Sequence, residues 1–366
     1  MKRLLCILLA LALTLAGCAP ASVPEEDDGR LKIVATVFPA YDFARAAAGD
    51  RANVTLLLPP GMESHSYEPT PADILAVQSC DLFIYLGGEA DAWVDTILSA
   101  VEPTGEVLRM VDCVELLEET HAEGMQTDPG HDHAGHSHGP EEDCDQPEDH
   151  RHDTEEEALL HDGHDHDEHA DEADHDGHDH DAKDPLGLGS VVGMDEHVWT
   201  SPANAAAITR EIGRQLAALN AANADAYQAD AEAYALRLEE LDGKFEAFFD
   251  SQPHRTIVFG DRFPLLYFAE RYGLDYYAAF PGCGTQTEPS AATIAFLTEK
   301  VRSEDLPTVW YIEFSNHLVA DSIAEATGRQ TAQFHTCHNV TRAELDAGAT
   351  YLSLMEGNLE TLMACF

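Results

Sequence analysis

The chain has 366 residues, of which 68 are acidic and only 20 are lysine or arginine, so its formal net charge at pH 7 is −48. This charge excludes nucleic acid as a natural partner and favours metal cations or cationic surfaces. The length is too great for one ordinary hydrophobic core, so we expect two domains.

Residues 1–18 have the pattern of an export signal. Two basic residues precede an apolar run from Leu4 to Leu15, which is too short to span a membrane. The Leu-Ala-Gly-Cys sequence that ends at Cys18 resembles the bacterial lipoprotein box, which implies cleavage before Cys18 and a lipid on its sulfur. An ordinary signal peptide with an incidental cysteine is the alternative. Residues 19–30, rich in Pro, Glu and Asp, are expected to form a flexible tether to the membrane.

Residues 31–200 predict an N-terminal lobe in which strands and helices alternate. The expected strands are 31–38, 54–58, 82–86 and 107–110, and the expected helices are 39–48, 71–78 and 90–98. This order predicts a mainly parallel sheet covered by helices. Ligands of such sheets bind beyond the carboxyl ends of the strands, and His65 follows the second strand.

Residues 115–184 interrupt this lobe with an acidic, histidine-rich insertion. It contains 27 acidic and two basic residues, 14 of the 20 histidines and few large apolar side chains, so we expect a disordered loop. Imidazoles flanked by carboxylates are expected to bind divalent transition metals weakly. The histidines of its repeated His-Asp-Gly-His-Asp-His-Asp sequence are His161, His164, His166, His175, His178 and His180. A solvating acidic loop with incidental histidines is the alternative.

Residues 201–250 predict one long spine helix between the two lobes. Ser201 is a strong N-cap residue, and Pro202 suits the first helical position. Apolar residues then recur at helical spacing, and no proline interrupts them before Pro253. An unbroken helix of ~45 residues would span roughly 65 Å. His197 lies just before it, where the first lobe ends.

Residues 251–366 repeat the alternation in a C-terminal lobe. The expected strands are 256–259, 275–280, 308–312 and 331–334, the expected helices are 265–272, 290–302 and 319–327, and residues 260–262 are expected to form a loop. The predicted fold is therefore α/β, with two lobes that each contain a mainly parallel sheet covered by helices. Polar side chains follow the C-terminal strands at Asp261, Glu313, His335 and His338. A single connecting helix would place them opposite His65 and His197, with a metal site in the cleft between the lobes.

Three motifs carry a family resemblance. The loop from His65 to Pro69, the stretch from Asp195 to Pro202 and Tyr272-Gly273-Leu274 together resemble the ZnuA-like, or cluster A-I, metal-binding lipoproteins of ATP-driven zinc and manganese importers. A His/Asp-rich loop before the second histidine matches the zinc-selective branch. The resemblance covers residues 31–366 and implies that His65 and His197 bind the metal, with Glu313 similar to an acidic position near the family site.

The same resemblance implies a high-affinity extracytoplasmic protein that captures Zn²⁺ and delivers it to an ABC transporter permease. The expected partners are the metal ion, the permease and the cell membrane, reached through the lipid anchor, and the chain is expected to be monomeric. Mn²⁺ is the alternative cargo, although imidazole-rich ligation favours zinc over that harder ion.

One position departs from the family pattern. Where these proteins usually have His-Asp, this chain has Gly260-Asp261, so the usual third histidine is absent. Tight zinc sites normally have at least three protein ligands, and the C-terminal lobe must supply the rest. His335 is the expected replacement, ahead of His338 and Asp261. A solvated loop histidine and a carboxylate paired with Arg262 are the alternatives for the last two.

Alternation along the last strand separates the two histidines that follow it. It directs His335 and Cys337 to one side and Thr336 and His338 to the other. We therefore do not expect both histidines to reach one ion unless the loop turns sharply after the strand.

The cysteines favour disulfides, because the chain is expected to be exported. Cys283 and Cys337 both follow strands of the C-terminal lobe and are the expected pair, with metal ligation by either as the alternative. No C-x-x-C spacing marks a cysteine-type zinc site.

No enzyme motif supports a catalytic function. The sequence lacks G-x-S-x-G, a P-loop and H-E-x-x-H, so we do not expect an enzyme. A zinc-dependent hydrolase is the main alternative, with Glu313 or Asp261 as its general base. A surface metal store or adhesin that works through the histidine-rich loop, and so serves cell adhesion, is a third interpretation.

Overall fold

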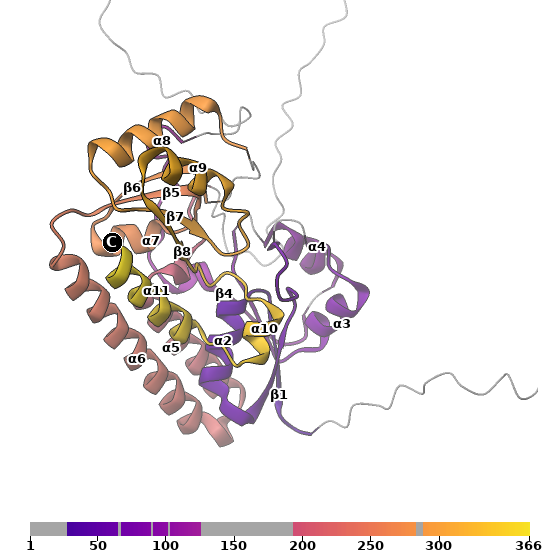
Figure 1. Ribbon diagram of the computed structural model, residues 1–366. Helices are drawn as coiled ribbons and strands as arrows, with labels where there is room; N and C mark the ends of the chain where they lie inside the picture. Colours follow the sequence, from indigo (N-terminus) through magenta and orange to yellow (C-terminus); the bar gives the residue numbers. More distant parts are fainter. Residues whose placement is uncertain (1–27, 65–66, 89–90, 102, 126–192, 283–287) are drawn as a thin grey trace, which may run out of the picture.

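The computed structural model describes residues 28–64, 67–88, 91–101, 103–125, 193–282 and 288–366 (Figure 1). Within these ranges no helix is both long and apolar enough to cross a membrane. Several predicted features lie outside the described residues: the signal peptide, the lipidation site Cys18, the ligand His65, the repeat histidines from His161 to His180, and Cys283.

The N-terminal lobe contains a four-stranded parallel sheet in the order β2-β1-β3-β4. Its strands are β1 (Leu31–Ala35), β2 (Ala52–Leu56), β3 (Leu82–Tyr85) and β4 (Glu106–Arg109). All four residues of β3 are buried, as is usual for a parallel strand covered on both faces. The predicted alternation of strands and helices is confirmed for this lobe.

Helices of the N-terminal lobe begin at the positions that their sequences favour. They are α2 (Phe38–Ala48), α3 (Pro71–Ser79) and α4 (Ala92–Ala100), with short 3-10 turns at Gly49–Arg51 and Met110–Cys113. Pro39 lies in the first turn of α2, which ends the first strand earlier than predicted. The Thr70 side chain accepts the N–H of Asp73, and the Asp73 carboxylate accepts the N–H of Thr70, which caps α3.

The C-terminal lobe repeats this architecture with the parallel order β6-β5-β7-β8. Its elements are β5 (Thr256–Phe263), α7 (Leu266–Tyr272), β6 (Asp275–Pro281), α8 (Ala291–Ser303), β7 (Thr308–Ile312), α9 (Leu318–Thr327) and β8 (Gln330–Phe334). The prediction of a loop at residues 260–262 is wrong. These residues continue β5, with an irregular register against β6 between Phe259 and Arg262.

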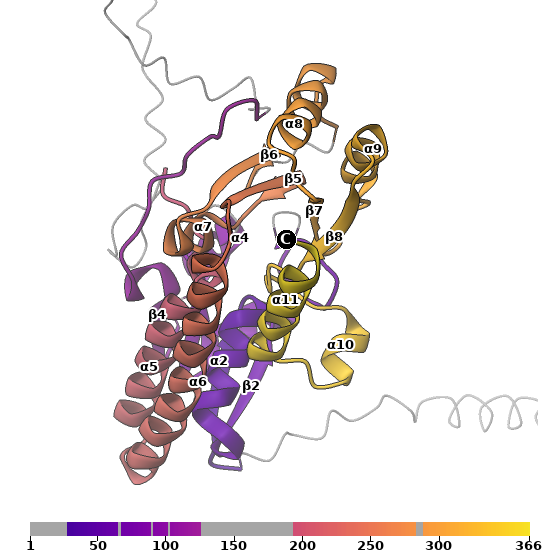
Figure 2. The same ribbon diagram turned by 60° about the vertical axis from the view of Figure 1, so that its left-hand side comes forward.

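The prediction of one unbroken helix over residues 201–250 is also wrong. The chain forms α5 (Pro202–Leu219) and α6 (Ala224–Asp250), which pack side by side (Figures 1 and 2). A 3-10 turn at Ala221–Asn223 separates them, with Asn220 before it and Asn223 at its end, and asparagine is a residue type that favours turns over helix interiors. Gly213 allows the close approach, since a Cβ there would lie 2.4 Å from the Cβ of Ala231. The 27-residue α6, roughly 40 Å long, contacts α2 of one lobe and α7 of the other.

Two further helices, α10 (Arg342–Asp346) and α11 (Tyr351–Cys365), follow the last strand and were not predicted. The last helix packs against α2, α6 and β8. The carboxylate of Asp42 in α2 accepts the backbone N–H of Tyr351 at 2.9 Å and the hydroxyl of Tyr234 in α6 at 2.6 Å. Burial raises the pKa of Asp42 in spite of these two bonds. The C-terminus of the chain thus completes the packing of the N-terminal lobe.

Residues 115–125 belong to the structured part of the molecule, so the prediction of disorder is wrong for this stretch. Glu118 forms an antiparallel bridge with Met194, and the N–H of Leu117 donates to the hydroxyl of Tyr267 in α7 at 3.1 Å. The segment therefore ties the N-terminal lobe to the C-terminal one. Residues 126–192 of the insertion lie outside the described residues.

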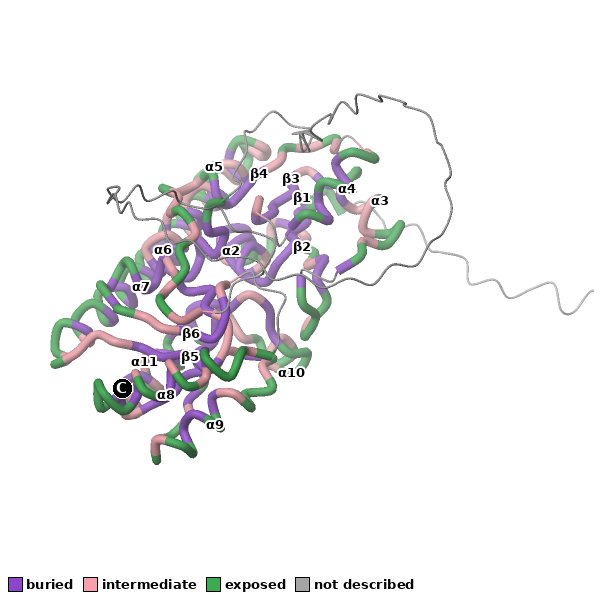
Figure 3. Tube along the Cα trace, turned by 90° about the horizontal axis from the view of Figure 1, so that it is seen from above, coloured by how far each residue is buried: buried purple, intermediate pink, exposed green. Residues whose placement is uncertain are grey.

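One hydrophobic core runs through both lobes, and its buried segments are purple in Figure 3. It extends from Ile33 in β1, through the buried faces of α5 and α6, to Phe334 in β8. A second, smaller cluster around Val258 and Val309 packs with α8 and α9 on the C-terminal sheet. The two lobes are therefore joined by a shared core as well as by the chain.

Candidate functional site

A small cavity of about 30 Å³ lies between the lobes, where loops from the carboxyl ends of strands meet. Its lining includes Glu63, His197, Arg262, Glu313, His338 and Asn339. This edge is where ligands usually bind in open parallel sheets. The volume suits a metal ion or a water molecule rather than an organic substrate.

His197 lies immediately before the 3-10 turn Val198–Thr200 that leads into α5, and only 1% of its surface is exposed. A carboxylate oxygen of Asp195 accepts its backbone N–H at 2.8 Å and lies 3.2 Å from its Nδ1. This contact orients the imidazole and leaves Nε2 for a metal. Burial lowers the pKa of His197, but the carboxylates of Asp195 and Glu196 outweigh this effect and the pKa is raised.

Glu313 follows β7 directly, and its side chain is only 6% exposed. Thr336, in the loop after β8, donates its N–H to one oxygen of the Glu313 carboxylate at 2.7 Å and its hydroxyl to the other. Each carboxylate oxygen has more than one lone pair, so the group can still bind a metal. Two neighbouring strand ends thus hold this carboxylate at the cavity.

His338 is the histidine after β8 that borders the cavity. Its ring centroid lies 6.3 Å from that of His197. The indole ring of Trp199 packs against both imidazoles, at 5.4 Å from His197 and 5.3 Å from His338. The Trp199 N–H donates to the carbonyl of Thr336 at 2.8 Å, which fixes the indole between the two lobes.

His335 does not border the cavity. Its Nδ1 accepts the N–H of Cys337 at 3.0 Å, and its Nε2 lies 3.8 Å from a carboxylate oxygen of Glu344. The Asn358 side chain in α11 accepts the backbone N–H of His335 and donates to its carbonyl, both at 2.7 Å. Thr336 and His338 line the cavity whereas His335 does not, although the Nδ1 of His335 lies 3.7 Å from a carboxylate oxygen of Glu313.

The carboxylate of Asp261 also forms its hydrogen bonds within the C-terminal lobe. One of its oxygens accepts the N–H of Arg262 at 2.8 Å, and the other accepts the N–H of Ile312 at 3.3 Å, which joins β5 to β7. It borders a neighbouring cavity of about 200 Å³ rather than the small one. At Gly260 a Cβ would lie 2.5 Å from backbone atoms of Ala320, so the packing of α9 leaves no room for the family histidine.

The described residues contain only part of a metal site. Among them, no three His, Cys, Asp or Glu side chains lie close enough together to hold one metal ion. The predicted ligand His65 is outside the described ranges and directly follows Ser64 in the sequence. Met62 and Glu63, just before it, border the cavity.

Cys337 is fully buried and forms no disulfide with another described cysteine, and burial raises the pKa of its thiol well above the ordinary value. Its predicted disulfide partner Cys283 is outside the described ranges, so this disulfide stays a prediction. The high pKa also disfavours the thiolate that metal ligation requires. Its φ of 63° gives the chain a sharp turn between His335 and His338.

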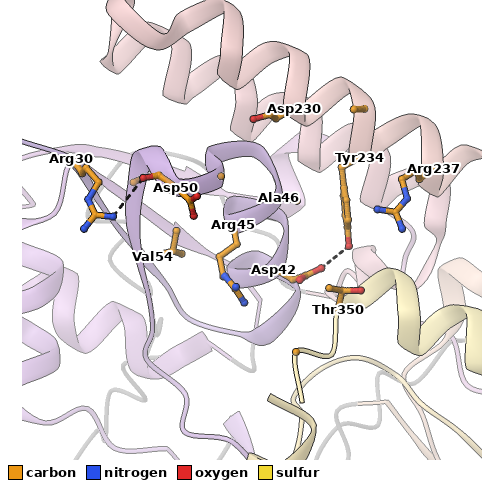
Figure 4. A pocket seen from close by; sticks show the side chains of 14 residues that line it. Arg30, Asp42, Arg45, Ala46, Asp50, Val54, Asp230, Tyr234, Arg237 and Thr350 are labelled. Atoms are coloured by element: carbon orange, nitrogen blue, oxygen red, sulfur yellow. Dashed lines mark hydrogen bonds between the residues drawn. The ribbon is translucent and has the colours of Figure 1, made fainter. Parts of the chain in front are cut away.

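A larger cavity lies elsewhere. It has a volume of about 560 Å³ and is bordered by α2, α6 and the segment before α11 (Figure 4). Its charged lining includes Arg45 and Arg237 beside Asp50 and Asp230, and none of the described residues that line it is a histidine or cysteine. The side chains at this cavity therefore do not suit a transition metal.

Comparisons with known sequences agree on one family. The ZnuA family model, described as "Zinc-uptake complex component A periplasmic", matches residues 33–365. The zinc-binding lipoprotein AdcA of Streptococcus pneumoniae R6 is 28% identical over 371 residues, which is 99% of this chain and 60% of that protein. The chain thus spans well under two thirds of AdcA. The high-affinity zinc uptake system protein ZnuA of Bacillus subtilis is 26% identical, with 97% of this chain and 95% of that protein covered.

Solved structures share the fold. The Zn(II)-bound ZnuA-like domain of S. pneumoniae AdcA superimposes with a TM-score of 0.64 at 24% identity, covering 92% of this chain and 99% of that one. Both structures thus have two lobes built on parallel sheets. Because the family model matches nearly the whole chain, the protein belongs to the ZnuA family.

Proposed function

We propose that this protein is an extracytoplasmic zinc-binding protein that captures Zn²⁺ and delivers it to an ABC transporter permease. The observation that carries the proposal is that His197, Glu313 and His338, from both lobes, border one cavity at the strand ends. Imidazole and carboxylate groups are common zinc ligands. The names of AdcA and B. subtilis ZnuA, both zinc proteins, support zinc as the cargo.

The proposed ligands are His197, Glu313 and His338, with His65 added because its motif resembles that of the family. His335 and Asp261 are secondary candidates, since both have other partners inside the C-terminal lobe. Zinc–nitrogen bonds are only ~2.0–2.1 Å long, so the two imidazole rings must move closer than their present separation of 6.3 Å. Metal binding would therefore close the lobes slightly.

The remaining parts of the chain fit the same function. Cys18 would carry the lipid that anchors a monomer to the cell membrane, with residues 19–30 as its tether. The histidine-rich insertion would collect Zn²⁺ through weak, exchangeable sites. No catalytic step is needed, and we propose that the protein is not an enzyme. Zn²⁺ is preferred over Mn²⁺ because three of the four proposed ligands are imidazoles.

Paired histidine variants test the site. His338→Ala should weaken zinc binding by at least ~10- to 100-fold, the loss that even indirect contacts to a metal cause. His335→Ala should weaken it less, because that ring lies beside Glu313 and Glu344 but does not line the cavity. Zinc titration calorimetry on metal-free protein, with a competing chelator for the tight site, measures both. Tight binding that survives His338→Ala but not His335→Ala would reverse this assignment.

Two outcomes would contradict the function itself. Wild-type protein without a tight zinc site would remove the basis of the proposal. Zinc-dependent turnover of an ester or peptide, lost in His197→Ala, would favour the hydrolase instead.

A further inference from the structure

An ion pair bridges the two lobes at the mouth of the small cavity. Nη1 of Arg262, in β5, lies 3.4 Å from Oε2 of Glu63, in the loop after β2. The Arg262 side chain is 22% exposed and that of Glu63 is 48% exposed. Both residues line the cavity together with His197 and Glu313. A guanidinium group therefore faces the space that the proposed function assigns to a metal ion.

The guanidinium cannot take part in metal binding. Arginine has no acceptor lone pair, and it stays protonated at every relevant pH. Among the described residues that line the cavity, Arg262 is the one permanent cation, facing the carboxylates of Glu63 and Glu313. A fixed positive charge beside a cation site opposes the entry of a divalent ion through simple Coulomb repulsion.

The ion pair is not needed to hold the loop in place. The side-chain amide of Asn339 already donates to the carbonyls of Pro59 and Met62, both at 2.8 Å, and Asn339 is buried. These two bonds attach the same loop to the C-terminal lobe without any charge. Exposed ion pairs add little to stability on their own. What distinguishes Arg262 is therefore the positive charge that it places at the cavity.

We propose that Arg262 is an affinity-setting residue that competes with the cargo ion. In the metal-free protein its guanidinium neutralises Glu63, and an incoming divalent cation has to displace it from that carboxylate. Arg262 thereby weakens zinc binding and favours release of the ion. This inference rests on the proposed function, because it concerns the same cavity.

The charge of Arg262 can be separated from its packing by two substitutions. Arg262→Gln should tighten zinc binding about tenfold at low ionic strength, and the gain should shrink as salt screens the charge. Arg262→Lys keeps the positive charge and should bind zinc like the wild type. Arg329→Gln is the matched control. Arg329 pairs with Asp305 near the amino end of β8, whereas the cavity lies at the carboxyl ends of the strands. Arg329→Gln should leave zinc affinity unchanged.

Glu63→Gln supplies the complementary test. It removes the carboxylate for which Arg262 and the metal compete, so zinc affinity should fall about tenfold at low salt. Chelator competition on metal-free protein measures every variant. The inference is overturned if Arg262→Gln leaves affinity unchanged or lowers it, if Arg262→Lys binds as tightly as Arg262→Gln, or if Glu63→Gln has no effect. A wild-type protein that binds no zinc would instead defeat the proposed function.

Discussion

Asp91 is a fully buried carboxyl group at the start of α4, beneath the loop that follows β3. One oxygen accepts the N–H of Leu86 at 2.6 Å and the hydroxyl of Thr36 at 3.2 Å, while the other has no hydrogen-bond partner among the described residues. Burial raises the pKa of Asp91 to about 7; the donor bonds oppose this effect and the nearby Glu196 carboxylate adds to it. Asp91 therefore changes its charge near neutral pH.

Metal-free protein should lose stability as the pH rises towards 8. The folded-state pKa of about 7 exceeds the ordinary aspartate value of 3.8, so the stabilisation is complete below pH ~4 and is lost as the pH rises through ~7. A shift of this size corresponds to on the order of 4 kcal/mol. Asp91→Asn cannot ionise and should flatten the profile. Thermal midpoints of both proteins between pH 5 and 8 measure the effect, and parallel profiles would contradict it.

At the level of single residues, the sequence predicts only part of the candidate site. His197 and Glu313 are selected through the family resemblance, and both border the cavity. The preference for His335 over His338 depends on which face of the last strand meets the cleft, and a shift of one residue reverses that face. The sequence shows that Gly260 lacks a side chain, but only the packing of Ala320 shows that none would fit.

At the scale of elements, the strands and most helices follow from hydrophobic runs and capping residues, and the errors have specific causes. The chain reverses direction at Asn220, within an Ala-rich stretch that has helical spacing. Because alanine favours helix on both sides of Asn220, the sequence predicts one continuous helix there. The starts of the last two helices could have been predicted from capping boxes in the sequence. Thr341 with Glu344 forms one box, and Thr350 with Ser353 forms the other. The path of β5 through residues 260–262 depends on pairing with β6, which sequence patterns do not specify.

Two glycines test how closely α5 and α6 pack. Gly213→Ala should lower the free energy of unfolding by ~1–3 kcal/mol, because its Cβ would meet that of Ala231 at 2.4 Å. Gly243→Ala, in α6, would place a Cβ with nothing within 4 Å of it, and should raise this free energy by up to about 1 kcal/mol through helix propensity alone. Urea denaturation of both variants measures the difference, and equal shifts would be evidence against close contact.

At the scale of the whole molecule, the segments on either side of the insertion contact each other. The N–H of Glu119 donates to the carbonyl of Gly193 at 2.9 Å, beside the bridge between Glu118 and Met194. The two ends of the insertion are therefore held together by described residues. The tight zinc site and the weak sites of the histidine-rich insertion can therefore be tested separately.

Replacing residues 126–192 by a short Gly-Ser linker should keep one tight zinc site and remove the weaker equivalents. The ligands proposed for the tight site lie outside this range, and the bridge between Glu118 and Met194 joins the segments on either side of it. Zinc titration calorimetry counts both classes of site. His197→Ala with the insertion intact is the converse control and should keep only the weak sites. Loss of the tight site on deletion would show that the insertion contributes ligands to it.

The return of α11 to the N-terminal lobe has a consequence for biosynthesis. Asp42 receives its two hydrogen bonds from Tyr234 and Tyr351, and Tyr351 belongs to the core that also contains Phe43. A ribosome completes the first lobe's own sequence long before it supplies these residues. The first lobe therefore cannot reach its final packing during synthesis until α11 has also been made. If the predicted export signal is used, we expect this delay to keep the nascent first lobe incompletely packed until its late partner helix is available.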